Sequence, residues 1–303
     1  MVAFLVVSHR SPKQVLRLVR TLREGEDIRV VVRHDQRRSA LAAAAVEEAG
    51  GRLLLDRHGV AWGDFAYAEM LIEALAQIAA EDDPEWVVVA SGQDYPLRPI
   101  AELERHLADT PHQALLHDCW ALDLEAEAPP PRDEFYRRYR FLHYPVPRPA
   151  ASVLSRALGR HAYVRVMPPG LRDLLGIRAP LHPFGPSLRC HVSADWLTLH
   201  RRAMRSILEF ARAQPRTMRY YRYTVIPSES LFATALAADR SISVGPAPRA
   251  MRFRGRSPHP DVWGERDVAE LLASGHYFAR KFDEVSDPGA LDLLDEARRA
   301  ARG

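Results

Sequence analysis

The chain has 303 residues, of which 47% are hydrophobic and 27% are charged, so a folded globular protein with a sizeable core is expected. The formal net charge of +3 is small for this length; it gives little support to nucleic-acid binding and would suit an anionic small substrate. No run of about eighteen apolar residues is present, so no segment is expected to span a membrane.

The two cysteines, Cys119 and Cys190, have the spacing of neither a metal site nor a redox motif, which predicts a reduced, cytoplasmic protein. Lysine occurs only at Lys13 and Lys281, and this preference for arginine is typical of GC-rich bacterial coding. The first residues, up to His9, lack the basic start of a signal peptide and are interpreted as the first strand.

Short apolar runs alternate with amphipathic stretches through the first part of the chain. Such runs suit strands that are buried on both faces, and they predict strands at 2–8, 28–32, 53–55, 87–90 and 114–116. Between them, helices are expected at 12–22, 41–49, 65–80 and 100–107. This alternation predicts an α/β fold with a mostly parallel central sheet and helices on both faces.

The second part of the chain opens with residues 128–192, which hold many prolines. Apart from helices at 154–163 and 171–175, they are predicted to form a loop-rich insertion on the acceptor side of a site. Regular structure is expected to return at 193–199, 201–213, 229–237 and 242–244, followed by a largely helical tail from 267. We expect one domain, with a nucleotide-binding half at 1–127 and a catalytic, diphosphate-binding half at 193–303.

The run Val87–Ala90 is the expected central strand. Ser91-Gly92 ends it, and Pro96 prevents its continuation. In open α/β sheets, ligands bind outside the carboxyl ends of the strands, and Asp94 occupies such a place. A strand followed by a tight turn, without any binding role, explains the same residues.

Several common catalytic and binding motifs are absent. No G-x-G-x-x-G follows the first strand, and no G-x-x-x-x-G-K-[ST] occurs, so dinucleotide and P-loop sites lack support. No G-x-S-x-G nucleophile elbow or zinc-site spacing is present. The nearest match to the Asp-x-Asp of metal-dependent sugar-nucleotide transferases is the weak pair Asp123 and Glu125.

Without a metal, a leaving diphosphate would need fixed cations, and the last third of the chain supplies them. Arg252, Arg254 and Arg256 lie close together, and Lys281 follows. A solvated basic surface would explain the arginines equally well. Lys281 lies between two phenylalanines, which favours a partly enclosed site.

Glu229 is a single carboxylate at the start of an apolar helix. In a purely structural interpretation, Ser228 caps the helix and Glu229 is a favourable acid in the first turn. In a chemical interpretation, Glu229 is the general base that an inverting glycosyl transfer requires.

Seven pieces of the chain, taken in order, resemble the core-2/I-branching β-1,6-N-acetylglucosaminyltransferase family, whose relatives include the peptide O-xylosyltransferases. They span nearly the whole chain. The pieces are His9 after the first strand, Arg33-His34-Asp35, Trp62-Gly63, Ser91–Leu97, Ser193–Leu199 with Trp196, Pro227-Ser228-Glu229 with Phe232 and Thr234, and Phe278–Asp283.

The resemblance implies a GT-A-like nucleotide-diphospho-sugar transferase fold, a UDP-sugar donor, inversion at the anomeric carbon and no metal or other cofactor. It assigns Glu229 as general base, Lys281 as a diphosphate ligand and Asp35 as a uridine contact. Trp62 is placed on the donor side. Asp94 is expected beneath the donor sugar, either as a contact or as part of the structure.

Two parts of the chain depart from the family pattern. The spacing of the basic partner of Lys281 differs, so Arg254 and Arg256 are both candidates, and His259 stays open. The segment Glu125–Tyr139 falls where the family contacts its acceptor, but it matches poorly and leaves the acceptor undefined. The membrane anchor and disulfides of animal members are missing, in agreement with the expected cytoplasmic bacterial enzyme.

The sequence therefore predicts a soluble, metal-independent inverting glycosyltransferase. Its partners would be a UDP-sugar, with N-acetylglucosamine favoured, and a carbohydrate or other hydroxyl-bearing acceptor, with no nucleic acid. One alternative is a metal-dependent transferase of the same fold that uses Asp123 and Glu125. The other is a non-catalytic protein that binds sugar nucleotides.

Overall fold

The computed structural model describes residues 1–301 except for 55–58, 61–62, 126–133, 168–170 and 255–259. None of the helices in these described ranges is both long and apolar enough to cross a membrane.

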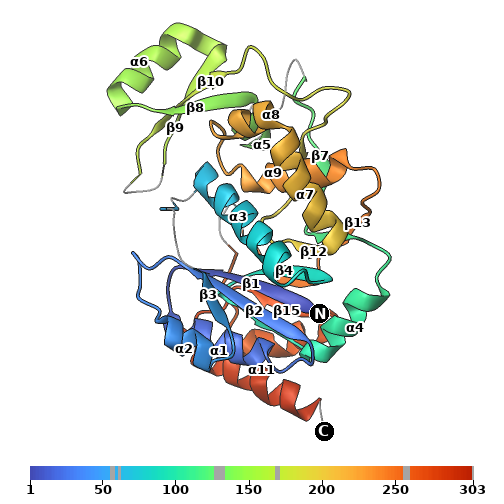
Figure 1. Ribbon diagram of the computed structural model, residues 1–303. Coiled ribbons are helices and arrows are strands. Elements are labelled where there is room, and N and C mark those ends of the chain that lie inside the picture. The colour runs from blue at the N-terminus through green and yellow to red at the C-terminus, as the bar shows by residue number, and fades with distance from the viewer. Residues whose placement is uncertain (55–58, 61–62, 126–133, 168–170, 255–259, 302–303) are drawn as a thin grey trace.

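A seven-stranded sheet forms the centre of the molecule, with the order β13-β6-β12-β4-β1-β2-β3 (Figure 1). Every neighbouring pair is parallel except those of β12, which is antiparallel to both of its neighbours. The predicted α/β fold with a mostly parallel sheet is thereby confirmed. The strands are β1 (Val2–Ser8), β2 (Ile28–His34), β3 (Arg52–Leu54), β4 (Trp86–Ser91), β6 (Ala114–Leu116), β12 (Thr198–His200) and β13 (Val244–Pro246).

Helices cover both faces of this sheet because its strands are apolar on both sides. In β1, Ala3 and Leu5 pack towards one helical layer, whereas Phe4 and Val6 pack towards the other. The first layer includes α3 (Phe65–Glu81), α7 (Arg201–Ala213), α8 (Pro215–Tyr221) and α9 (Ser228–Ala238). The second includes α1 (Pro12–Leu22), α2 (Ala43–Glu48), α4 (Ile100–Asp109), α10 (Val268–Ala273) and α11 (Pro288–Ala300).

The strand register brings three chain segments to one edge of the sheet. Ser8 at the end of β1 is paired with His34 at the end of β2, and Val7 is paired with Ser91 at the end of β4. The residues that follow these strands therefore emerge together, at the edge where open α/β sheets bind ligands.

A smaller sheet joins the two most distinctive sequence pieces. Its order is β14-β15-β5, with bounds β14 (Arg249–Met251), β15 (Phe278–Arg280) and β5 (Asp94–Pro96). Asp94 is opposite Arg280 in the antiparallel pair, so segments nearly two hundred residues apart lie side by side. The tail, which was expected to be largely helical, therefore also contributes a strand. A 3-10 turn at Glu265–Asp267 precedes α10.

The described residues of 134–178 form a lobe above the first helical layer, and α5 of this lobe packs into the core of that layer through Tyr136 and Tyr139 (Figure 1). The lobe contains an antiparallel sheet of order β8-β10-β9, so the prediction of a loop-rich insertion is wrong here. The helix expected at 171–175 is also wrong, because Leu174 begins a strand. The elements are α5 (Glu134–Arg140), β8 (Phe141–Pro145), α6 (Arg148–Leu158), a 3-10 turn (Gly159–His161), β9 (Ala162–Arg165) and β10 (Leu174–Arg178).

Two further differences concern the region around the lobe. The short strands β7 (Trp120–Ala121) and β11 (His191–Val192) pair with each other, and neither was predicted. Pro227 occupies the N-cap position of α9 without a side-chain capping hydrogen bond, and Ser228 is the first residue of the helix, so the capping interpretation of Ser228 is wrong.

Leu75→Ala in α3 is expected to lower the free energy of unfolding by about 2–5 kcal/mol, since Leu75 is fully buried and the change leaves a cavity. Denaturant unfolding measures this difference. Gln77→Ala on the exposed side of the same helix is the control, and it should change stability by no more than about 0.5 kcal/mol. Similar losses in both variants would contradict the packing of α3.

Candidate active site

Glu229 lies in the first turn of α9, directly after a kink in the backbone. Ile226 has a φ of 51°, in the left-handed region that a β-branched residue rarely adopts. Two hydrogen bonds hold the kink: the Ile226 amide donates to the carbonyl of Gly63, and the Tyr139 hydroxyl donates to the carbonyl of Ile226. The position of Glu229 is thus fixed from the loop before α3 and from the lobe.

Glu229 forms an ion pair across the boundary between the lobe and the rest of the molecule. Arg138 of α5 donates from Nη1 to Oε2 of Glu229 at 2.5 Å. Burial raises the pKa of Glu229 above its usual value, although Arg138 acts in the opposite direction. The carboxylate is therefore held in place and is more basic than an exposed glutamate.

Arg138 is itself the middle of a longer chain of charges. Glu134 accepts hydrogen bonds from Arg138 at 3.0 Å and from Arg165 of β9 at 2.5 Å. The alternating series Arg165, Glu134, Arg138 and Glu229 therefore connects the lobe sheet to α9.

Asp195, in the loop between β11 and β12, is a site residue that the sequence analysis missed. Burial and the nearby Glu229 carboxylate raise the pKa of Asp195 to about 7, while a hydrogen bond with Ser228 lowers it. The Oδ1 atom is buried and has no hydrogen-bond partner in the described part of the chain. Asp195 belongs to the matched piece Ser193–Leu199, where the sequence analysis singled out only Trp196.

A basic cluster follows β15, and Lys281 is at its centre. Lys281 is half-buried, while Phe278 and Phe282 on either side of it pack into the core. Burial lowers the pKa of Lys281, and the neighbouring charges of Arg280 and Arg10 lower it further. Arg10 comes from the loop after β1 and pairs with Asp283 at 3.0 Å.

The structure brings Arg254 to the same cluster. Arg254 forms an ion pair with Asp261 at 2.7 Å, and the negative charge of Asp261 also raises the pKa of Lys281. Arg252 serves a structural purpose: it pairs with Asp261 and Asp267 and stacks on Trp263. Arg256 and His259, the other predicted candidates, lie outside the described residues.

Asp35 lies where predicted, directly after β2. Burial raises its pKa, but hydrogen bonds from Arg37 outweigh this effect and lower the pKa below its usual range. The negative charge of Asp35 raises the pKa of His9, which follows β1, so the two residues lie close together at the edge of the sheet. Trp62, the remaining residue predicted on the donor side, lies outside the described residues.

Asp94 is completely buried, and both of its oxygens have partners. One accepts from Nη1 of Arg280 at 3.2 Å; the other accepts from the amide of Ser91 at 3.0 Å and lies 3.3 Å from Nη2 of Arg249. Arg280 also stacks on Trp196, with its guanidinium carbon 4.0 Å from the ring centroid. Asp94 thus orients Arg280. A direct contact between Asp94 and a ligand stays a prediction.

These side chains form a continuous series that we call the charged row: Glu229, Asp195, Arg280, Lys281 and Arg10. Tyr67 on α3 lies near the middle of the row, where acidic residues give way to basic ones: burial and the charge of Asp195 raise the pKa of Tyr67, and the charge of Arg280 lowers it. One end of the row can accept a proton, and the other can bind an anion.

The sequence also offered Asp123 and Glu125 as a metal-binding pair. The Oδ1 atom of Asp123 accepts from the amide of Glu125 at 2.9 Å, and Glu125 pairs with His182 at 2.8 Å. Among the described residues, no group of three or more His, Cys, Asp or Glu side chains is arranged to hold a metal.

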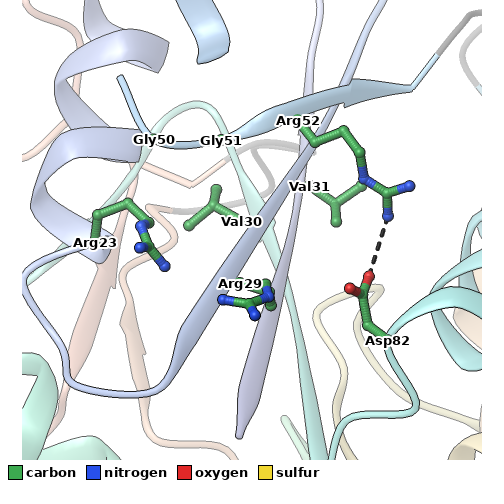
Figure 2. A pocket seen from close by; sticks show the side chains of 8 residues that line it. All are labelled: Arg23, Arg29, Val30, Val31, Gly50, Gly51, Arg52 and Asp82. Carbon is green, nitrogen blue, oxygen red and sulfur yellow. Dashed lines mark hydrogen bonds and ion pairs between the residues drawn. The ribbon is translucent and has the colours of Figure 1, made fainter. Parts of the chain in front are cut away.

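A hollow of about 320 Å³ lies elsewhere in the molecule (Figure 2). It is formed by the first half of β2, the start of β3 and the ends of α1 and α3, away from the edge that carries the charged row. Arg52 and Asp82 form an ion pair at its border. The lining residues are Arg23, Arg29, Val30, Val31, Gly50, Gly51, Arg52 and Asp82.

Comparisons with known proteins give only distant likenesses. No protein-family model matches the sequence, and no curated protein matches it. The structure is similar to that of mouse xyloside xylosyltransferase 1, with 10% identity, a TM-score of 0.40, and 92% of this chain and 97% of that chain covered.

A second similar structure is from Bacillus anthracis and is described as a glucose-1-phosphate thymidylyltransferase in complex with sucrose. Here the identity is 10%, the TM-score is 0.30, and 71% of this chain and 78% of that chain are covered. At these TM-scores, neither likeness carries a functional conclusion.

The wild-type protein should lose thermal stability relative to the Asp195→Asn variant as the pH rises from about 4 to about 7. The folded-state pKa of Asp195 is raised from 3.8 to about 7, so within this window the folded state keeps a proton that the unfolded state has lost. Melting temperatures measured across this range test the difference. Asp109→Asn, at an exposed position, is the control, and its curve should parallel the wild type.

Proposed function

We propose that this chain is a metal-independent inverting glycosyltransferase that moves a sugar from a UDP-sugar to an acceptor hydroxyl. The observation that carries the proposal is the charged row, which puts a partly buried pair of carboxylates and a basic cluster on one side of the sheet. The resemblance of seven ordered sequence pieces to the core-2/I-branching family supports the same assignment.

The basic end of the row suits the diphosphate of the donor. Lys281 offers a compact positive charge, and Arg10 and Arg254 add forked donors close to it. Their ion pairs with Asp283 and Asp261 balance part of this charge. Fixed cations of this kind stabilise the charge that develops on a leaving diphosphate.

The acidic end of the row suits the acceptor. In the proposed reaction, Glu229 takes the proton of the acceptor hydroxyl while that oxygen forms a bond to C1 of the sugar. The bond between C1 and the diphosphate oxygen breaks, and UDP leaves with the electron pair. Attack from the face opposite UDP inverts the anomeric carbon.

Asp195 is proposed to hold a substrate hydroxyl beside Glu229. Its Oδ1 atom, which has no partner among the described residues, can accept a hydrogen bond, which would satisfy a buried oxygen that otherwise costs stability. The resemblance also favours uridine contact by Asp35 and N-acetylglucosamine as the transferred sugar. A thermal-shift panel of UDP-sugars would identify the donor.

Glu229→Gln is expected to lower kcat by about 10²–10⁴-fold, because the amide cannot accept the proton, while the affinity for UDP stays nearly unchanged. Steady-state assays with the donor found by the panel and calorimetry with UDP measure the two quantities. Glu209→Gln on the exposed side of α7 is the control. Full activity of Glu229→Gln would rule out its role as base.

Lys281→Ala is expected to weaken UDP binding by about tenfold to a hundredfold, the loss typical of a charge-assisted contact. The other lysine, Lys13, is exposed, so Lys13→Ala provides a matched control for the loss of one charge. Unchanged affinity of Lys281→Ala would contradict the assignment. Binding of UDP-sugars without transfer or hydrolysis would indicate a non-catalytic protein instead.

The same assays test whether a metal is needed. Activity should persist in EDTA, since the proposal assigns the neutralising charge to protein side chains. Loss of activity in EDTA and recovery with manganese would contradict this part of the proposal and favour Asp123 and Glu125 as metal ligands.

A further inference from the structure

Helix α6 at the end of the lobe has its apolar face turned to solvent. Ala150, Val153, Leu154 and Ala157 follow the i, i+3, i+4, i+7 spacing of one helix face, and all four are exposed. Val153 is 64% exposed and Leu154 is 43% exposed. In a helix that packs on its own protein, such a stripe would normally face the core.

The opposite face of α6 packs on the lobe sheet, and it consists of small residues. Ala151 is fully buried against Ala162 and Leu175, whereas Ser152 and Ser155 are partly buried. The helix is therefore anchored through its less apolar side. Its orientation leaves the larger aliphatic side chains available to a partner.

Positive charge surrounds this exposed stripe. Residues 141–178 contain six arginines but only one acidic residue, Asp173, which pairs with Arg148. In the described part of the chain, no acidic side chain pairs with Arg156 or Arg160, which lie beside the stripe. A partner of negative charge is therefore favoured.

The stripe is too small and too simple for a stable protein interface. Such interfaces bury about 800 Å² on each partner and depend on aromatic anchors, whereas this stripe is one helix face of alanine, valine and leucine. A second copy of the chain would also bring its own arginines against these arginines. A lipid surface requires only a few inserted aliphatic side chains with basic neighbours.

We propose that α6 binds the surface of an anionic lipid bilayer, with Val153 and Leu154 inserted among the lipids and Arg156 and Arg160 at the head groups. Figure 1 shows α6 at the end of the lobe farthest from the seven-stranded sheet, where a flat surface can reach it. This binding is independent of the proposed sugar transfer.

Co-sedimentation of the full chain with lipid vesicles tests the proposal. The protein should sediment with vesicles of phosphatidylcholine and phosphatidylglycerol, less so with phosphatidylcholine alone, and binding should weaken as salt is added. The double variant Val153→Ser with Leu154→Ser should bind about tenfold less, because both side chains lose their apolar surface. Arg156→Gln with Arg160→Gln should lose most of the preference for phosphatidylglycerol.

The control is Leu293→Ser on α11, where a leucine of similar exposure, 40%, lies far from the lobe. It should bind vesicles as the wild type does, and circular dichroism should show that all variants are folded. The proposal is overturned if the wild type does not sediment with either vesicle, or if the Val153 and Leu154 variant binds equally well. A dimer in sedimentation velocity that this variant abolishes would also overturn it.

Discussion

The buried carboxylate of Asp94 is the constraint on which the site depends. A charge without solvent exposure needs partners, and Asp94 has two, Arg280 and Arg249, from strands near the end of the chain. These contacts attach β15 and β14 to the segment after β4, and Arg280 in turn supports the ring of Trp196. Lys281, the next residue, is thereby fixed beside the edge of the large sheet.

The charged row depends on topology as much as on this carboxylate. Arg10 follows β1, Asp195 precedes β12, Glu229 begins α9 and Lys281 follows β15, so four separate regions of the chain contribute. Parallel strands deliver their carboxyl ends to one edge, and the kink at Ile226 directs the start of α9 towards Asp195. Opposite charges that are distant in sequence therefore become neighbours without a local motif.

Local pattern predicts the sheet well and the lobe poorly. The runs at Val2–Ser8 and Trp86–Ser91 are continuous and apolar, which identifies buried strands, whereas Phe141–Pro145 mixes aromatic, polar and proline residues and gives no such signal. Glu229, Lys281 and Asp35 were predicted as site residues from ordered motifs. The proposed role of Asp195 depends on burial beside Glu229, and the partners of Asp94 lie far away in sequence, so neither could be predicted from a local stretch of sequence.

The alternating charges that run from the lobe to α9 have one further consequence. Glu134 is shared between Arg165 on the lobe sheet and Arg138, which holds the proposed base. The charges of both Arg138 and Glu134 act on Glu229, Arg138 lowering its pKa and Glu134 raising it, so the proton affinity of that carboxylate depends on residues of the lobe. The lobe and α9 therefore form a single electrostatic unit, in which the basicity of Glu229 is set partly by side chains that lie outside its own helix.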